Sequence, residues 1–216
     1  SLVGSEMCIR DRFWTSPLGM DQFVDAMQET IQMVLLSFLF GGIWGLIQGV
    51  ALVVTRDKGI LPNKAIYHGL NPIINALRSL PFFILAIAVI PLTKWIVGSS
   101  IGTWAAIVPL TIFIGPYMGR LIETSLLEVN DGIIESAQAM GATPWQIVFK
   151  FILPEARSSL ILNMTTATIS LIGATAMAGA VGAGGIGDLA YSYGYQRFDS
   201  SVMLLSVIVL LILVQL

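Results

Sequence analysis

Few residues of this chain could take part in covalent or nucleotide chemistry, and the first candidates are glycines. The stretch Gly182-Ala-Gly184-Gly-Ile-Gly187 matches the G-x-G-x-x-G pattern that cradles a pyrophosphate in dinucleotide-binding folds. That pattern requires a preceding strand, a following helix and an acidic residue about 20 positions further on. Here a long apolar segment precedes it, and Asp199 follows Gly187 by only 12 residues. We therefore interpret the stretch as a glycine-rich external bend.

The other reactive side chains are too few to form a catalytic or metal site. His68 is the one histidine and Cys8 the one cysteine, which excludes a histidine-based metal cluster and a disulfide framework. No G-x-x-x-x-G-K-[ST] motif occurs, so the chain itself does not hold ATP phosphates in the way of Walker-type proteins. We expect no catalytic residue, no bound cofactor and no metal. An intramembrane enzyme is the least favoured class, because no paired acids or metal ligands lie at membrane depth.

Composition places most of the chain in a membrane. Of 216 residues, 56% are hydrophobic and 11% are charged, whereas soluble domains average about 25% charged residues. The net charge of −2 and the absence of a basic run argue against a nucleic-acid partner. Lipid must therefore cover much of the surface. Residues 1–12 lack the apolar core of a signal peptide, and we interpret them as a non-native leader before a single membrane domain, 13–216.

The hydropathy pattern predicts an all-α integral membrane protein with five transmembrane helices. A crossing needs about 20 apolar residues, and the predicted spans are about 31–54, 79–96, 98–119, 158–181 and 201–216. The last is short, so we expect the C-terminus to be truncated. Seven basic residues flank the connections between spans 1 and 2 and between spans 3 and 4, while Lys94 and Arg197 lie on the other side. The positive-inside rule then places both connections and the C-terminus in the cytoplasm, and the N-terminus outside.

The second of these connections contains a polar helical hairpin, residues 131–154. Asp131 can cap a first helix whose apolar positions Ile133, Ile134, Ala137 and Met140 share one face. Gly141 suits the left-handed position that ends such a helix. Thr143-Pro144-Trp145-Gln146 forms a capping box that starts a second helix, which ends at Pro154. The alternative is an ordinary amphipathic connector on the lipid surface, although the corner is neither basic nor rich in bulky apolar residues.

Two helix faces within the predicted spans carry a pattern. Gly41, Gly45 and Gly49 recur at every fourth position, which lets another helix approach closely. A mildly polar stripe follows on the fourth span and is the candidate translocation path: Asn163, Thr166, Ser170, Gly173 and Met177. Hydrogen bonding between helices explains such a stripe equally well. The thioether of Met177 is flexible enough to close a passage and to touch a thioether substrate.

The hairpin motif resembles the EAA loop of binding-protein-dependent ABC importers. It reads Glu135-Ser-Ala-(3)-Gly141-(10)-Ile152-Leu-Pro154, with Ser136 where the family has alanine. The resemblance extends over residues 13–216, and three further stretches are similar to permease subunits of methionine-uptake ABC transporters: Arg78-Ser-Leu-Pro81, Ala106-Ile-Val-Pro-Leu-Thr111, and Ala178 to Asp188 with Tyr193-Gly-Tyr-Gln-Arg-Phe198. These relatives often carry an aromatic residue where this chain has Ala174, so the local gate is expected to differ.

The resemblance implies a type I ABC importer permease fold and a role for each part of the chain. It implies an ATP-driven importer of methionine, L- and D-methionine included, in the bacterial inner membrane. The partners would be a second copy of this chain, two ATP-binding subunits that hold ATP and Mg²⁺, a periplasmic or lipid-anchored methionine-binding protein, and membrane lipid. The residues it assigns to coupling with the ATPase are Glu135, Ser136, Ala137, Met140, Gly141, Ala142 and Pro154.

Two alternatives stay open at this level. A permease for another amino acid or small solute would share the hairpin and the spans. A passive channel formed by an oligomer of this chain would have no use for an ATPase-docking hairpin, so the hairpin argues against it. An ion-driven carrier is disfavoured, since no charged residue lies near the centre of a predicted span.

Overall fold

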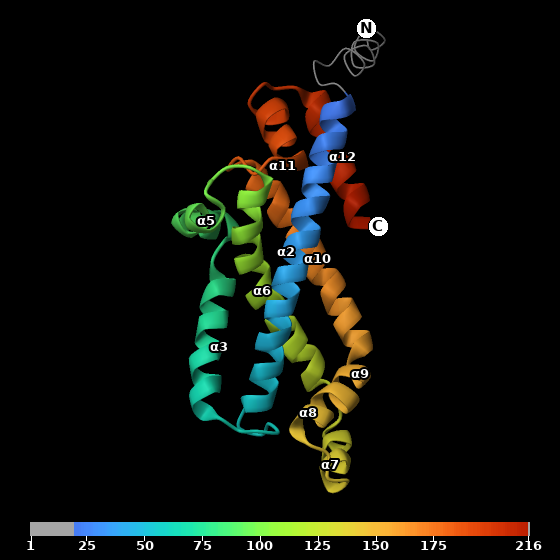
Figure 1. Ribbon diagram of the computed structural model, residues 1–216. Helices are drawn as coiled ribbons and strands as arrows, with labels where there is room; N and C mark the ends of the chain where they lie inside the picture. The colour runs from blue at the N-terminus through green and yellow to red at the C-terminus, as the bar shows by residue number, and fades with distance from the viewer. Residues whose placement is uncertain (1–19, 216) are drawn as a thin grey trace. The chain divides into compact units, whose positions relative to one another are not determined.

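The computed structural model describes residues 20–215, which form helices joined by short turns and contain no strand (Figure 1). The all-α fold class is thereby confirmed. The predictions for residues 1–12, Cys8 included, lie outside the described residues. Contacts divide the described chain into two compact units. The first unit comprises residues 20–36, 82–110 and 171–215, and the second comprises 37–81 and 111–170.

Three helices are long and apolar enough to cross a membrane. They are α2 (Met20–Thr55), α6 (Thr103–Leu127) and α10 (Arg157–Gly179). They correspond to the predicted spans 31–54, 98–119 and 158–181, but α6 is shifted toward the C-terminus, to 103–127, and α10 ends at 179. Helix α2 begins about three turns earlier than its apolar run. The extra turns hold polar residues, which a helix tolerates once its apolar part has crossed the bilayer.

The predicted second span, 79–96, is not one helix. Helix α3 (Lys64–Ser79) ends before it, and the interval contains α4 (Phe82–Ala88) and α5 (Ile90–Val97). Leu80 is extended because proline at position 81 disfavours a helical residue before it, and a second proline opens α5. Counting the bent pair α3 and α4 as one span gives four crossings by length and composition. Helix α12 (Ser200–Gln215) is apolar but has 16 residues, so the count of five spans stays a prediction.

In the second unit, α2 and α6 approach closely along a line of glycines. A Cβ atom placed on Gly45 would lie 2.8 Å from the carbonyl oxygen of Gly115 and 3.0 Å from the amide nitrogen of Gly119. On Gly49 it would lie 2.7 Å from the carbonyl oxygen of Gly119. The predicted close helix approach at this glycine repeat is confirmed, and the repeat belongs to the packing of the fold.

The glycine-rich bend belongs to the first unit, where it joins α10 to α11 (Gly185–Leu189). Gly182, Gly184 and Gly185 all have positive φ. The amide of Gly185 donates to the carboxylate of Glu29 (2.7 Å), and the amide of Ile186 donates to the hydroxyl of Thr30 (2.9 Å). A helix and not a strand precedes the bend, and these two amides are already bonded to side chains of α2. The G-x-G-x-x-G pattern therefore has a structural role here and does not bind a dinucleotide. The π-helix η2 (Ala190–Tyr195) follows and leads to α12.

Candidate functional site

The candidate site is the hairpin of the second unit, which we define as residues 130–156. Its first arm is α7 (Asp131–Ala139). Its second arm is a continuous run of α8 (Pro144–Gln146), the π-helix η1 (Ile147–Ile152) and α9 (Leu153–Glu155). Figure 1 draws both arms in yellow to orange, between the end of α6 and the start of α10. The hairpin therefore connects two of the three long apolar helices directly.

The first arm is capped one residue earlier than predicted. Asn130 is the N-cap, and its side-chain oxygen accepts a hydrogen bond from the amide of Gly132 (2.8 Å). Asp131 is instead the first helical residue, and its carboxylate faces Arg56 at 3.9 Å. Both side chains cap helices well, and an acid in the first turn also complements the helix dipole. Position 131 therefore contributes charge to the hairpin, and position 130 supplies the cap.

The corner between the arms has the predicted geometry. Gly141 adopts φ +77°, and its amide donates to the carbonyl of Gln138 (2.9 Å). The amide of Ala142 donates back to the carbonyl of Ala137 (3.1 Å). Thr143 and Gln146 then form a complete capping box, each side chain accepting from the other residue's amide. Every exposed turn of the corner is thus fixed by local hydrogen bonds.

The second arm contains a π-helical segment that the sequence pattern does not predict. Across residues 147–152 the hydrogen bonds skip one residue further than in an α-helix, as in the bond from the amide of Leu153 to the carbonyl of Val148. In a regular α-helix the ring of Pro154 would clash with the carbonyl of Lys150, and the wider turn spreads the backbone there. Pro154 lies inside the last turn, and the arm ends at Glu155 rather than at Pro154.

The hairpin has a buried base and an open corner. Ala137 is completely buried, in an apolar cluster with Ile122, Ile147 and Ile152. Met140, predicted to share that apolar face, is 70% exposed, because it is the C-cap and the chain leaves the helix there. The other members of the predicted coupling set are exposed apart from Ala142, which is half-buried: Glu135, Ser136, Gly141 and Pro154. The base fixes the hairpin to α6, and its corner stays available to a partner.

Glu135 lines a polar cavity of about 430 Å³ at the side of α7. The opposite wall is the loop after α2, which contributes Arg56, Lys58 and Gly59. Arg56 contacts α7 through an ion pair with Asp131 (3.9 Å). The Nε atom of Arg56 is buried and has no hydrogen-bond partner. Among residues 20–215, no cation lies within 4 Å of the Glu135 carboxylate. Sequence reasoning missed Arg56, which lies far from the hairpin along the chain.

The structure divides the candidate translocation stripe of α10 into two groups. Asn163 donates to the hydroxyl of Ser125 on α6 (2.7 Å), and Ser170 contacts the hydroxyl of Tyr117 (3.4 Å). Those two side chains join helices, as the packing interpretation expected. The remaining members, Thr166, Gly173 and Met177, are exposed. Of the predicted stripe, these three members are the ones left uncovered.

A buried ion pair near the end of α6 also escaped the sequence analysis. Arg120 donates to the carboxylate of Glu123, which is 5% exposed, and to the side-chain oxygen of Asn71 on α3 (3.2 Å). The spacing of three along a helix could have indicated the pair. These bonds join α6 to α3 next to the base of the hairpin. We therefore assign the pair a structural role and not a role in ligand binding.

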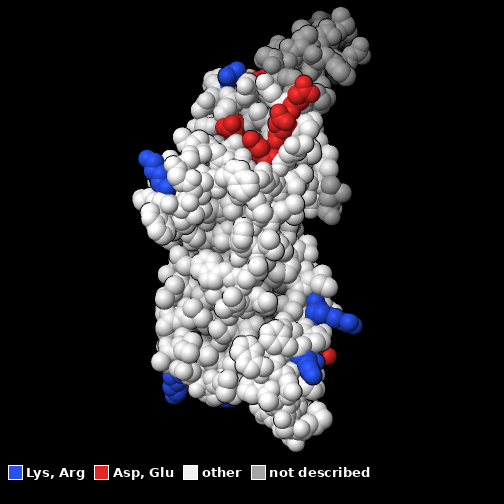
Figure 2. Space-filling view, in the orientation of Figure 1, with Lys and Arg blue, Asp and Glu red and all other residues white. Residues whose placement is uncertain are grey.

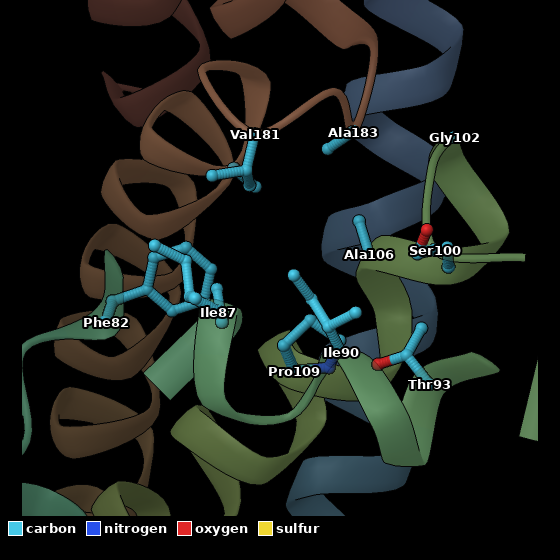
Figure 3. Close-up of a pocket in the computed structure, with 13 residues that line it drawn as sticks. Phe82, Ile87, Ile90, Thr93, Ser100, Gly102, Ala106, Pro109, Val181 and Ala183 are labelled. Carbon is cyan, nitrogen blue, oxygen red and sulfur yellow. The ribbon is translucent and has the colours of Figure 1, made fainter. Parts of the chain in front are cut away.

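The described part of the first unit contains two cavities, and the larger, of about 420 Å³, is lined mainly by apolar side chains such as Phe198, Met203 and Leu204. Figure 3 shows the smaller, which has a volume of about 40 Å³, with Phe82, Ile87, Ile90, Val181 and Ala183 pointing inward. It has no titratable lining residue and is too small for a metabolite. In Figure 2 the surface is mostly uncharged, and acidic side chains gather over the N-terminal end of α2. Within residues 20–215 no cluster of three or more metal-ligating side chains occurs.

Comparisons with known proteins place this architecture among transporters. Residues 41–216 match the family model described as "Binding-protein-dependent transport system inner membrane component". The chain is 45% identical over 198 residues to the "Probable D-methionine transport system permease protein MetI" of Vibrio cholerae, covering 92% of this chain and 88% of that protein. It is 48% identical over 151 residues to the "D-methionine transport system permease protein MetI" of Escherichia coli K12, with 70% of each covered.

Solved structures agree with the sequence comparisons. A chain of the "MetNI methionine ABC transporter" in an inward-facing conformation is similar with a TM-score of 0.89 and 46% identity, and 91% of each chain is covered. A chain of an "amino acid ABC transporter with histidines" matches with a TM-score of 0.72 at 16% identity, which supports the fold alone. The expected type I ABC importer permease fold is confirmed.

Proposed function

Because this chain belongs to the family of binding-protein-dependent transport system inner membrane components, we propose that it is the permease subunit of an ATP-driven methionine importer. The names of its relatives carry the choice of methionine. The single structural observation behind the ATP-driven part is the hairpin, whose base is buried and whose corner is open. A passive channel has no use for such a corner.

The proposal gives two roles to the predicted coupling residues. Glu135, Ser136, Met140 and Gly141 contact the ATP-binding subunit, since all four are exposed on α7 and at the corner. Ala137 and Ala142 anchor that surface by packing at the base. Pro154 acts indirectly, at the end of the second arm. Glu135 supplies a carboxylate without a cationic partner among the described residues, and a basic side chain of the ATPase would complete the pair.

The partners follow from what this chain lacks. ATP and Mg²⁺ belong to two separate ATP-binding subunits, because no Walker motif occurs here. A second copy of the chain covers the exposed face of α10, and the path runs along Thr166, Gly173 and Met177. A periplasmic or lipid-anchored binding protein delivers methionine at the outer side. The basic residues in both connections support a cytoplasmic hairpin and an external N-terminus.

The hairpin transmits motion from the ATPase to the membrane helices. When the ATP-binding subunits close, they pull the corner, and the buried base prevents the hairpin from folding away. The hairpin follows α6 and precedes α10 with only short turns between them. Its displacement therefore tilts both helices as rigid elements and changes which side of the membrane the path faces.

Transport in vesicles tests the substrate. The complete complex, reconstituted with its ATPase and binding protein, is expected to accumulate labelled methionine only in the presence of ATP. Unlabelled L-methionine, D-methionine and other amino acids are added as competitors. Stronger competition by an unrelated amino acid would contradict the methionine assignment. Flux that persists without ATP or without the ATPase would instead support a channel.

Co-purification tests the docking surface. Gly141→Asp is expected to leave the chain in the membrane but to release the ATPase, whereas Gly69→Asp, an exposed glycine on α3, retains it. Glu135→Gln is expected to lower ATP-driven transport, because it removes the charge that would pair with a basic side chain of the ATPase. Glu128→Gln, exposed outside the hairpin, is its control. Wild-type stoichiometry of ATPase with Gly141→Asp would contradict the proposed dock.

A further inference from the structure

An apolar groove of about 300 Å³ lies beside the second arm of the hairpin, within the second unit. One wall is the last turns of α2, with Leu46, Ile47 and Ala51. The other wall is the second arm, where the rings of Trp145 and Phe149 stack with centroids 5.8 Å apart. The indole N–H of Trp145 is the one polar side-chain group in the lining, so the groove offers almost nothing to a polar ligand.

The position of the groove indicates what surrounds it. Residues 31–54 contain no charge and extend about 36 Å as a helix, enough to cross the hydrocarbon core. Ile47 and Ala51 therefore lie in the cytoplasmic third of a membrane span. The groove also continues an uncovered apolar stripe on the same helix, where Leu39 and Ile43 are 53% and 54% exposed. The same helix also lines the groove through Leu46, Ile47 and Val50, so a bilayer around this span would reach the groove as well.

We propose that this groove, formed by α2 and the second arm of the hairpin, binds an acyl chain of a membrane phospholipid. A volume of about 300 Å³ is within the range of small-molecule sites. Trp145 and Phe149 are 70% and 55% exposed, and a burial of this kind of surface is favourable. Tryptophan is also the side chain most typical of the membrane–water interface.

Two other occupants fit the groove less well. An ATP-binding subunit is soluble, and its approach to Ile47 would require it to enter the depth of a membrane span. A second copy does carry exposed apolar side chains, such as Leu204 and Leu211 on α12, but the proposed function already assigns the second copy to the exposed face of α10. The lipid occupant requires only continuity with the bilayer that already covers α2.

A bound acyl chain would stabilise the second arm of the hairpin, which transmits motion from the ATPase to α10. This step rests on the proposed function. The groove is lined by residues of α8 and η1, including Trp145 and Phe149, while the corner and α7 lie outside it. Filling the groove would hold the second arm against α2, so that a pull at the corner moves α10 instead of bending η1. Lipid chain composition would then alter coupling between ATP hydrolysis and transport.

Photolabelling of the assembled complex tests the site. The complex is placed in vesicles of phosphatidylethanolamine and phosphatidylglycerol that contain a phosphatidylcholine with a diazirine on one acyl chain, and labelled peptides are identified by mass spectrometry. Trp145 and Phe149 are expected to be labelled in the wild type. Leu61→Asp places a charge at the exposed rim of the groove. It is expected to lower that labelling about tenfold, the ratio for the lost burial of one side chain.

Matched variants separate the groove from general lipid contact. Ile66→Asp, equally exposed on α3 but outside the groove, is expected to leave labelling at Trp145 unchanged. Ala51→Phe fills the groove and is expected to act like Leu61→Asp. Equal labelling in all variants would overturn the inference. So would the absence of label at Trp145 and Phe149 in the wild-type complex, or cross-links between copies at Trp145 in place of lipid.

The same samples keep this inference distinct from the proposed function. Leu61→Asp is expected to retain the ATPase, because the corner around Gly141 is untouched. A wild-type chain that binds lipid in the groove but never co-purifies with an ATPase would refute the proposed function and leave the lipid site standing. An ATPase that binds normally, together with unchanged labelling in both groove variants, would refute the lipid site alone.

Discussion

The glycines of the α2–α6 contact and the glycine of the hairpin corner serve opposite purposes. Gly45 is helical, and a Cβ atom there would lie within 3.0 Å of the backbone of α6. Gly141 has φ +77°, yet nothing lies within 4 Å of the position its Cβ would take. At Gly45 the neighbouring helix requires glycine, and at Gly141 the turn of the backbone itself requires it. The crowded Gly45 therefore belongs to a packed helix contact. The uncrowded Gly141 belongs to an exposed turn that is free to contact a partner.

The largest effect is expected at the crowded position. Gly45→Ala forces α2 and α6 apart, and overpacking of this kind costs about 1–3 kcal/mol. Folded protein recovered from membranes should fall, with a lower melting temperature of the remainder. Gly69→Ala is the matched control, since α3 has open space there and alanine favours a helix by about 0.5–1 kcal/mol. Equal stability of the two variants would contradict the distinction between crowded and open glycines.

The next effect is expected at the corner and should leave the fold intact. Gly141→Val places a branched side chain at a left-handed position, which costs about 1–2 kcal/mol. The affinity for the ATPase should fall about tenfold. The melting temperature of the isolated permease should fall less than with Gly45→Ala, because the exposed corner relaxes locally. Gly141→Asn is the control, because asparagine tolerates this backbone conformation. The comparison fails if valine and asparagine bind the ATPase equally well.

The same contrast applies along α10, where Asn163 is packed and Met177 is open. Asn163→Leu removes the hydrogen bond to Ser125 and leaves that hydroxyl with fewer partners, at a cost of about 1 kcal/mol. We expect a lower melting temperature with methionine transport nearly unchanged. If the variant lost most of its transport activity but kept wild-type stability, Asn163 would instead belong to the translocation path.

The smallest effect on stability is expected at Met177, which is 55% exposed. Met177→Ala removes little packing in the single chain, so the melting temperature should remain within measurement error. The rate of methionine transport should change, because this thioether lies on the uncovered face assigned to the path. Transport kinetics in reconstituted vesicles provide the measurement. Unchanged kinetics would limit the path to the more polar members of the stripe.

The features that sequence predicted well are local in the chain. Each can be recognised from residues a few positions apart. They are the turn at Gly141, the capping box of Thr143 and Gln146, and the three long apolar helices. The N-cap was misplaced by one residue because Asn130 and Asp131 are both good caps and only the fold selects between them. The arrangement of α3, α4 and α5 was missed because the hydropathy of 79–96 is continuous across Pro81 and Pro91, the positions at which the helices are interrupted. Arg56 meets Asp131 only through the tertiary fold.

The π-helical stretch in the second arm has a consequence for the length of the hairpin. Its wide turn accommodates one more residue than an α-helical path between the same two ends. The arm thus stores a spare peptide unit between Thr143 and Pro154. Deleting one residue from 147–152 would remove that unit and bring the ring of Pro154 against the carbonyl of the preceding turn. The wide turn is therefore what allows a proline near the end of an arm that remains a continuous helical run.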